Sequence, residues 1–323
     1  MIGGQFIGVD VGGTKVAAAS LEQGRLGPSH VVPTDTSGSD ALIDQLVHAI
    51  GEVRLPGARA VGIGVPSVVE FATGRIRFSV NIPLADLPLR RILTDRIGLP
   101  VYVENDASCA ALAESYDGEE LVAQDLVMFT VGTGVGGGLV LGGKLYRGAT
   151  GAAPELGHTI IGMDLVNGAA DPAARPPQPG SLESLASGSA LDRLAREALG
   201  REDATGRDVV RAAGEGDERA QRAMRILGER LGIGIANAIN TFDPREVVIG
   251  GGVSAAGDLL LAPARETARR FTLPGVGTET TIRLARRGGE AGVLGAALLA
   301  LQEFTEDQRT TQPPPLDERT ALT

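Results

Sequence analysis

The sequence predicts an α/β protein with two lobes. Its 323 residues, 43% of them hydrophobic, can form one large core or two medium ones. Segments typical of buried strands alternate with segments whose apolar residues recur at helical spacing, as in α/β folds. A strand, a glycine turn and a returning strand occur at the start of the chain and again about 120 residues later. We therefore expect two similar sheets that face each other.

The first part of the chain begins with a predicted hairpin. Residues 5–11 form an apolar strand, and residues 16–21 return from the glycine turn of GVDVGGTK. Residues 39–54 carry apolar side chains at helical spacing, and residues 60–65 form a short buried strand that ends at Pro66.

The same pattern continues through the middle of the chain. VYVEN, residues 101–105, predicts a strand, and the alanine-rich residues 107–115 predict a helix with Asp106 at its start. Residues 126–131 form another buried strand, followed by the glycine turn GTGVGGG and the returning strand LVLGGKLY with its own tight turn.

The last part of the chain contains a loop, two helices and a third glycine turn. We expect a loop over residues 164–180, a long helix over 217–242, and a strand with a glycine turn in REVVIGGGVS. A closing helix is expected over residues 289–304. Residues 305–323 have little apolar content, which predicts a disordered tail.

Composition excludes several classes of function. A net charge of −10 without a basic run argues against binding to nucleic acid or to an anionic membrane. No apolar run approaches the length of about 18 residues that a membrane helix needs, and no signal peptide is evident. With Cys109 as its single cysteine, the chain forms no intramolecular disulfide. We expect a cytoplasmic protein, a small-molecule partner and a buried, unreactive Cys109.

The three glycine turns indicate a site for phosphates. Consecutive backbone N–H groups in such a turn can converge on an anion, because no Cβ blocks the approach. One turn alone fits a plain hairpin as well as a phosphate site, whereas three favour a nucleotide. The pattern is not a Walker motif, and it is not a dinucleotide fingerprint, since the chain continues from Val16 as a strand.

The order of motifs resembles the ROK family of sugar kinases (repressors, open reading frames and kinases) in the actin-like ATPase superfamily. The resemblance covers about residues 5 to 304 and rests on FIGVDVGGTK, VENDASCAALAE, TVGTGVGGGLVLGGKLYRG, ELGH, SLESLASG and VVIGGGVS. It implies a ribonuclease H-like fold with ATP and sugar in the cleft between two lobes. The small lobe would comprise residues 1–112 with the closing helix 289–304, the large lobe residues 113–288, and the tail residues 305–323.

Asp106 is the candidate general base. On position alone a helix N-cap is the favoured interpretation, because aspartate fills that position well. The resemblance reverses this preference, since the aspartate of the ENDA motif accepts the proton of the sugar hydroxyl. It also implies that Asn105 contacts the sugar; Glu104 is left without a role.

The resemblance places nucleotide and metal ligands on the three turns. Asp10 would hold Mg²⁺, directly or through water, since Mg²⁺ combines few carboxylates with phosphate oxygens; a plain turn residue is the alternative. Lys15, one of two lysines, either contacts phosphate or lies on the surface. The proposed phosphate and adenosine contacts are Asp10, Gly12, Gly13, Thr14, Lys15, Gly132, Thr133, Gly134, Gly251 and Gly252.

Sugar recognition needs several convergent polar groups, because unpaired hydroxyls on a buried sugar are costly. By resemblance these groups come from Asn81, Asn105, Asp106, Glu155, His158 and Glu183. Without the resemblance, each would more often be an ordinary surface charge or a satisfied polar residue.

The sequence departs from the family at the structural zinc site. Most members bind zinc through three cysteines and the histidine of ELGH, but here the cysteine positions are Ala174, Pro176 and Ser181. Only one of the roughly four ligands that zinc needs remains, so we predict no zinc. We hypothesise that a backbone carbonyl or carboxylate from residues 164–181 orients His158 instead.

The expected activity is that of an ATP- and Mg²⁺-dependent hexose kinase, with glucokinase as the leading interpretation. Fructose, mannose or N-acetylhexosamine kinase activity is the alternative, and polyphosphate is an alternative donor. A sugar-binding regulator without turnover is the alternative from another class. A DNA-binding repressor is disfavoured, since only four residues precede the first strand. The family implies a homodimer.

Overall fold

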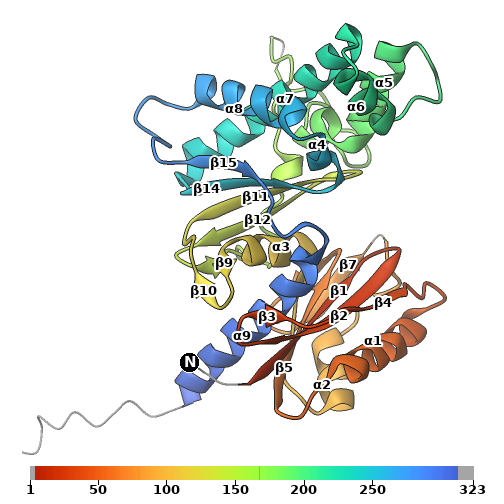
Figure 1. Ribbon diagram of the computed structural model, residues 1–323, viewed down its shortest axis with the longest axis vertical. Coiled ribbons are helices and arrows are strands. Elements are labelled where there is room, and N and C mark those ends of the chain that lie inside the picture. Colours follow the sequence, from red (N-terminus) through yellow and green to blue (C-terminus); the bar gives the residue numbers. More distant parts are fainter. Residues whose placement is uncertain (1–3, 80, 167, 312–323) are drawn as a thin grey trace, which may run out of the picture.

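A computed structural model describes residues 4–79, 81–166 and 168–311. The chain forms two lobes, each built on a twisted sheet, with helices on the outer faces and two helices between the sheets (Figure 1). The strand orders are β3-β2-β1-β5-β8, with β4 beside β2, and β13-β12-β11-β14-β15.

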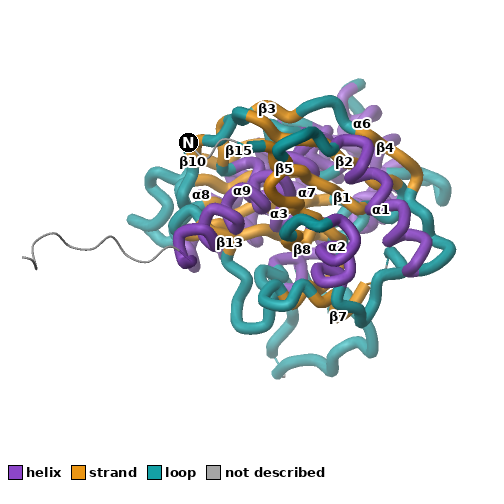
Figure 2. Tube along the Cα trace, turned by 90° about the horizontal axis from the view of Figure 1, so that it is seen from below, coloured by secondary structure: helices purple, strands orange, loops and turns teal. Residues whose placement is uncertain are grey.

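The first sheet lies between two layers of helices. Its strands are β1 (Gln5–Val11), β2 (Lys15–Glu22), β3 (Arg25–Leu26), β4 (His30–Pro33), β5 (Ala58–Val65) and β8 (Val101–Asn105). Helices α1 (Ser39–Val53) and α2 (Leu89–Ile97) cover one face, and α9 (Ala291–Thr311) covers the other (Figure 2). Because both faces are covered, β1 and β5 are nearly continuous apolar runs, as parallel strands of a buried sheet are. A separate hairpin of β6 (Ser67–Glu70) and β7 (Arg75–Ser79) follows β5.

The second sheet repeats the first in order and direction. Its strands are β11 (Leu126–Val131), β12 (Val135–Leu141), β13 (Lys144–Leu145), β14 (Glu246–Gly250) and β15 (Thr281–Leu284). The remaining elements are α3 (Asp106–Glu114), β9 (Tyr116–Asp117), β10 (Glu120–Leu121), η1 (Leu156–His158), α4 (Leu182–Ala186), α5 (Gly188–Leu199), α6 (Gly206–Gly214), α7 (Glu218–Phe242), η2 (Gly252–Ala256), α8 (Asp258–Phe271) and η3 (Gly288–Glu290). In each sheet an antiparallel hairpin is extended by two parallel strands, so the predicted recurrence is confirmed.

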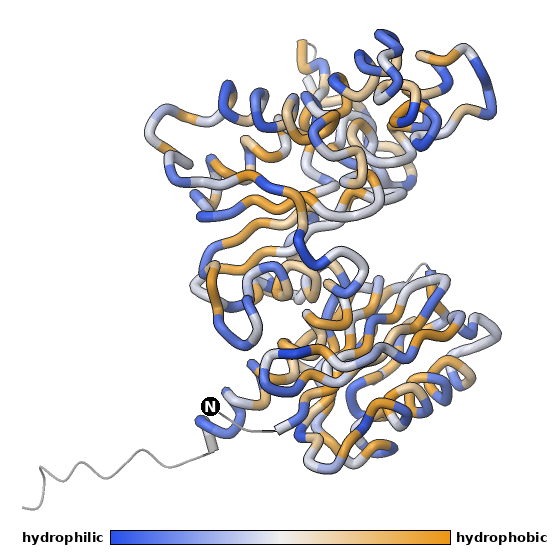
Figure 3. Tube along the Cα trace, viewed as in Figure 1, coloured by the Kyte–Doolittle hydropathy of each residue, from blue (hydrophilic) through white to orange (hydrophobic). Residues whose placement is uncertain are grey.

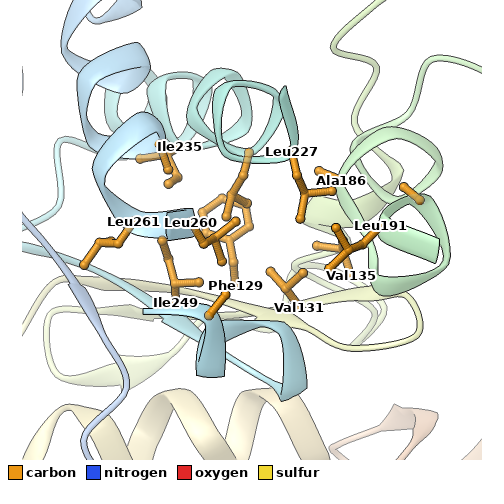
Figure 4. Close-up of a cluster of buried hydrophobic side chains, with 14 of the residues drawn as sticks. Phe129, Val131, Val135, Ala186, Leu191, Leu227, Ile235, Ile249, Leu260 and Leu261 are labelled. Atoms are coloured by element: carbon orange, nitrogen blue, oxygen red, sulfur yellow. The ribbon is translucent and has the colours of Figure 1, made fainter. Parts of the chain in front are cut away.

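The core of the second lobe forms where helices pack on this sheet. Phe129, Val131 and Ile249 point from the strands toward Leu227 of α7 and Leu260 of α8, and all five are buried (Figure 4). Apolar residues run along the strands of both sheets in the same way (Figure 3). Burial of these side chains is the main stabilising term for each lobe.

The two lobes exchange helices across their interface. Strand β8 of the first sheet leads into α3, which packs on β11 and β12 of the second sheet. Strand β15 of the second sheet leads into α9, which packs on β1 and β5 of the first. The predicted boundary at residue 112 falls inside α3, because this helix continues to Glu114 and belongs by its contacts to both lobes.

Helices α3 and α9 cross without room for a side chain at the contact. A Cβ added at Gly295 of α9 would lie 1.7 Å from the backbone oxygen of Cys109 in α3. Cys109 is fully buried, and burial raises the pKa of its thiol, so it packs as a small apolar residue as predicted.

The end of the chain differs from the prediction. Helix α9 continues to Thr311, so a tail that starts at residue 305 is wrong; Phe304 is buried and packs on Phe6, which holds the helix beyond that point. Residues 312–323 lie outside the described residues. No helix in the described ranges is long and apolar enough to cross a membrane.

We expect opposite effects from two Gly→Ala substitutions in helices. Gly295→Ala should lower the free energy of unfolding by at least about 2 kcal/mol, because the new Cβ overlaps the α3 backbone. Gly51→Ala, in α1 with nothing within 4 Å of the new Cβ, should raise it by about 0.5–1 kcal/mol. Urea unfolding of both variants measures the difference. Equal effects at the two positions would contradict the proposed close contact of α3 and α9.

Candidate active site

Two adjoining cavities lie between the lobes, and a third, lined by residues of the second lobe, adjoins both. The first, of about 400 Å³, and the second, of about 530 Å³, share the residues Asp106, Ala107, Thr130 and Gly251. The third, of about 1020 Å³, adjoins the first at Gly132 and the second at Gly252. One continuous cleft therefore offers space for a sugar next to a much longer ligand.

The carboxyl ends of the parallel strands bring the polar residues of the cleft together. Asp10 lies near the end of β1 and Asp106 directly after β8, both in the first sheet. Thr130 of β11 and Gly251 after β14 come from the second sheet. Ligands of open α/β sheets bind at this edge, because there the loops and helix N-termini converge.

Asp106 is the first residue of α3 and does not cap it. The Asn105 side chain is the N-cap, and its Oδ1 accepts hydrogen bonds from the N–H groups of Ala107 and Ser108 at 2.9 and 3.1 Å. The N-cap interpretation of Asp106 is therefore wrong. Burial raises the pKa of Asp106, and hydrogen bonds from the Ala107 N–H and from Asn105 partly oppose this. A carboxylate with a raised pKa is a stronger base, which suits proton abstraction.

Asp10 faces the same cleft. Burial, and next the charge of Asp106, raise the pKa of Asp10 to about 6, while Lys15 lowers it. The first turn of α9 packs closely against this carboxylate at Gly292. A Cβ added at Gly292 would lie 2.5 Å from the Cγ of Asp10.

These two carboxylates fit a magnesium ion. Each is destabilised by burial, and the charge of Asp106 further raises the pKa of Asp10, so a divalent cation beside them would favour the ionised forms. Mg²⁺ is usually held by one or two carboxylates together with substrate phosphates. Asp10, next to the glycine turns, is placed to hold such an ion.

The glycine turns differ in how they meet the cleft. In the first turn, the Gly12 N–H donates to the Lys15 carbonyl at 2.8 Å, and Thr34 Oγ1 donates to the Gly12 carbonyl at 2.6 Å. Lys15 lines the second cavity, whereas Gly12, Gly13 and Thr14 line none of the three.

The second and third turns line the cleft directly. Gly132 and Gly134 line the first cavity, and Thr133 lines the third together with Gly132. Gly251 and Gly252 line the second cavity. The Gly132 N–H donates to the Gly134 carbonyl at 2.9 Å, so the amides that these turns offer to an anion at the junction of the cavities are those of Thr133, Gly134, Gly251 and Gly252.

All six expected sugar-contacting residues line the first cavity: Asn81, Asn105, Asp106, Glu155, His158 and Glu183. Glu183 lies in the first turn of α4, and its Oε2 accepts a hydrogen bond from the Val135 N–H at 2.9 Å. Asn81 lies against Gly13 of the first turn. The structure therefore gathers at one place residues that are distant along the chain.

His158 faces the carboxylate of Glu155. Its Nε2 lies 3.7 Å from Oε2 of Glu155, and no hydrogen bond from the described part of residues 164–181 reaches the imidazole. Among the described residues the acid that faces His158 is Glu155, and the orientation of His158 by the loop stays a hypothesis. Burial raises the pKa of Glu155, His158 lowers it and Glu183 raises it.

The loop is closed by other means at its base. Ile160 forms a bridge with Ser181, and the N–H groups of Ile161 and Gly162 both donate to the Gly180 carbonyl. Farther out, the amide of Gln178 accepts from the Ala173 N–H and donates to the Ala173 carbonyl. Among the described residues no group of three or more His, Cys, Asp or Glu is placed to hold a metal ion. The absence of zinc stays a prediction.

Some residues of the first cavity gave no signal in the sequence. Ser67 opens β6, and residues 151–154 form the wall before Glu155; both segments line the cavity. Their composition is that of ordinary turn or strand residues. The packing of the chain in three dimensions, rather than any motif, places them there.

Comparison with known proteins adds independent findings. A family model described as ROK family matches residues 6–303. The chain is 34% identical to a glucokinase of Halalkalibacterium halodurans, over 92% of this chain and 95% of the relative. It is also 34% identical to an N-acetyl-D-glucosamine kinase of Escherichia fergusonii, over 92% of this chain and all of the relative.

Solved structures agree with these relatives. A ROK hexokinase from Thermus thermophilus superposes with a TM-score of 0.77 at 37% identity, covering 94% of this chain and 99% of the other. A ROK family glucokinase from Streptomyces griseus, in complex with glucose and AMPPNP, superposes with a TM-score of 0.73 at 34% identity, covering 93% of this chain and 100% of the other.

The raised pKa of Asp10 predicts a pH-dependent gain in stability for Asp10→Asn. The folded pKa lies above the ordinary value, so the folded state binds more protons between about pH 4 and 6, and stability falls as the pH rises through this window. Asn does not ionise. The variant should equal the wild type near pH 4 and exceed it by on the order of 2 kcal/mol above pH 7. Urea unfolding at several pH values tests this, and a pH-independent difference would contradict it.

Proposed function

The chain belongs to the ROK family, and from this membership we propose that it is a glucokinase, which transfers the γ-phosphoryl group of ATP to glucose and releases ADP. Its fold is the two-lobed α/β fold of the actin-like ATPases. It is an ATP-dependent sugar kinase, as its relatives are, and the choice of sugar and the roles of the residues are parts of the proposal.

The observation that supports this function best is the position of Asp106. Its carboxylate lies where the cavity lined by the sugar-contacting candidates meets the cavity lined by the glycine turns. In the proposed reaction, Asp106 takes the proton of the sugar hydroxyl, the hydroxyl oxygen forms a bond to the γ-phosphorus, and the bond from phosphorus to the β–γ bridging oxygen breaks. Phosphoryl transfer requires this in-line arrangement and charge stabilisation by surrounding donors.

The chain's own groups supply most of that stabilisation. The amides of Thr133 and Gly134 would face the γ-phosphate, with Gly132 closing the turn through its hydrogen bond to the Gly134 carbonyl, and Gly251 and Gly252 would face the adenosine side. Lys15 lines the cavity beside Asp10 and would neutralise phosphate charge. Bound Mg²⁺, held by Asp10 directly or through water, would neutralise the developing charge on the phosphate oxygens.

The sugar is the part of the proposal with the strongest rival. The glucokinase and the N-acetyl-D-glucosamine kinase relatives share the same identity with this chain. The hexokinase and glucokinase structures favour an unsubstituted hexose, so we place glucose first. Turnover with N-acetylglucosamine, fructose and mannose in the same assay decides among them.

Assembly and location are further parts of the proposal. We expect a homodimer in the cytoplasm, without zinc. Sedimentation velocity gives the mass of the assembly, and metal analysis of the purified protein gives its zinc content.

Asp106→Asn should lower kcat for glucose by about 10²- to 10⁴-fold, because asparagine cannot accept the proton. Glucose binding should persist, since the side chain keeps its shape. ADP release is followed with ATP, Mg²⁺ and a panel of hexoses. Asp95→Asn, which alters an exposed carboxylate on α2, serves as the control and should match the wild type.

Two results would reject the proposal. Wild-type protein that binds sugars but phosphorylates none of them with ATP would favour a regulator or another donor, such as polyphosphate. An Asp106→Asn variant with unchanged kcat would exclude Asp106 as the base.

A further inference from the structure

Three charged side chains, those of Glu104, Arg147 and Glu303, form a largely buried group beside the site. The Arg147 guanidinium lies between two carboxylates: its Nε is 2.5 Å from Oε2 of Glu104, and its Nη2 is 2.8 Å from Oε1 of Glu303. The side chain of Glu104 is 2% exposed, that of Glu303 16% and that of Arg147 20%. Burial raises the pKa of Glu104, and the charge of Arg147 opposes this.

Glu104 joins this group to the base. Its second oxygen, Oε1, accepts a hydrogen bond from the Asn105 N–H at 2.9 Å. Asn105 in turn caps α3, whose first residue is Asp106. One carboxylate therefore connects the Arg147 guanidinium to the point where β8 ends and the helix that carries Asp106 begins.

Arg147 also begins the segment that forms a wall of the sugar cavity. It follows β13, and residues 151–155 of the same segment line the cavity. This segment packs directly on the β6–β7 hairpin, since a Cβ at Gly151 would lie 2.3 Å from the backbone oxygen of Val69. The Arg147 guanidinium lies 3.4 Å from the ring centre of Phe71, at the turn of that hairpin.

The third connection runs to the long helix between the lobes. Glu303 lies on α9, whose first turn presses on Asp10 through Gly292. Arg147 thus contacts the end of β8, helix α9 and the β6–β7 hairpin at once, and it starts the segment that leads to Glu155.

We propose that Arg147 is a positioning residue for the kinase reaction: it holds the Asp106 junction and the sugar-facing segment 151–155 in one fixed arrangement. This inference rests on the proposed function. A flat guanidinium with several donors can bind two carboxylates and stack on a ring in one geometry, whereas an ammonium cannot. Removing Arg147 alone leaves Glu104 buried without its partner and should lower stability as well, so the test must separate the loss of geometry from the loss of stability.

The test compares single, double and control variants of the full chain. Arg147→Met should lower kcat/KM for glucose by about 10²-fold, through both kcat and the KM for glucose, because small displacements of reacting groups are costly. Arg147→Lys should lower kcat/KM for glucose by about tenfold, since lysine keeps the charge but lacks the planar guanidinium that binds two carboxylates at once. The KM for ATP should stay within about twofold of the wild type. Lys144→Met is the matched control, because Lys144 makes an exposed ion pair with Glu306 of α9, the helix that also carries Glu303.

The double variant Glu104→Gln with Arg147→Met separates positioning from stability. The double variant removes the 2% exposed Glu104 carboxylate together with its partner and leaves only the more exposed Glu303 unpaired, so the melting temperature should recover part of what Arg147→Met loses. The kcat/KM for glucose should stay low, because the segment is no longer tied to the Asp106 junction. Recovery of activity together with stability would overturn the proposal, as would an equal loss in Lys144→Met.

Failure of the proposed function gives a different pattern. Glucose binding by each variant is measured alongside turnover, by equilibrium dialysis with labelled glucose. Wild type that binds glucose without turnover rejects the kinase, while a weaker affinity of Arg147→Met still supports the positioning of the sugar wall. Unchanged kcat and unchanged affinity in Arg147→Met reject the positioning role and leave the kinase intact.

Discussion

Two carboxylates that face one cleft impose the main constraint on this structure. Asp10 lies near the end of β1 and Asp106 directly after β8, on either side of β5 in the first sheet. Burial raises the pKa of both side chains. Holding them there costs stability, so the surroundings must fix them firmly. Asp106 is fixed by a helix that Asn105 caps, and Asp10 by the strand hairpin and by the first turn of α9. A cation and phosphates bound beside the two carboxylates would offset this cost.

The exchange of helices between the lobes explains why both carboxylates depend on the same support. Helix α3 begins at Asp106 and packs on the second sheet, and α9 begins beside Asp10 and packs on the first. Where the two helices cross, Gly295 lets the backbones touch. A relative movement of the lobes would therefore displace both carboxylates through these two helices.

The rebuilt loop shows how a segment can be fixed without thiolate ligands. Backbone pairing at its base, between residues 160–162 and 180–181, and the amide of Gln178 farther out hold the loop in place. Glu183, in the first turn of α4, accepts a hydrogen bond from the Val135 N–H beside the second glycine turn. The end of the loop is thus tied to the second glycine turn by one hydrogen bond. His158 is left to pair with Glu155, three residues away.

The sequence by itself indicated helices α1, α3, α7 and α9, most strands of the two sheets and the three glycine turns, and the resemblance supplied the set of polar residues that line the cleft. Periodicity and turn chemistry are local properties of the chain, and the order of the motifs indicated the family and its candidate site residues. Only the tertiary structure decided that Asn105 rather than Asp106 caps α3, that Glu155 faces His158, and that α9 continues past residue 305. It also brought Arg147 between Glu104 and Glu303, which are separated from it by 43 and 156 residues. Such pairings depend on how two sheets and two crossing helices pack, and no local pattern encodes that geometry.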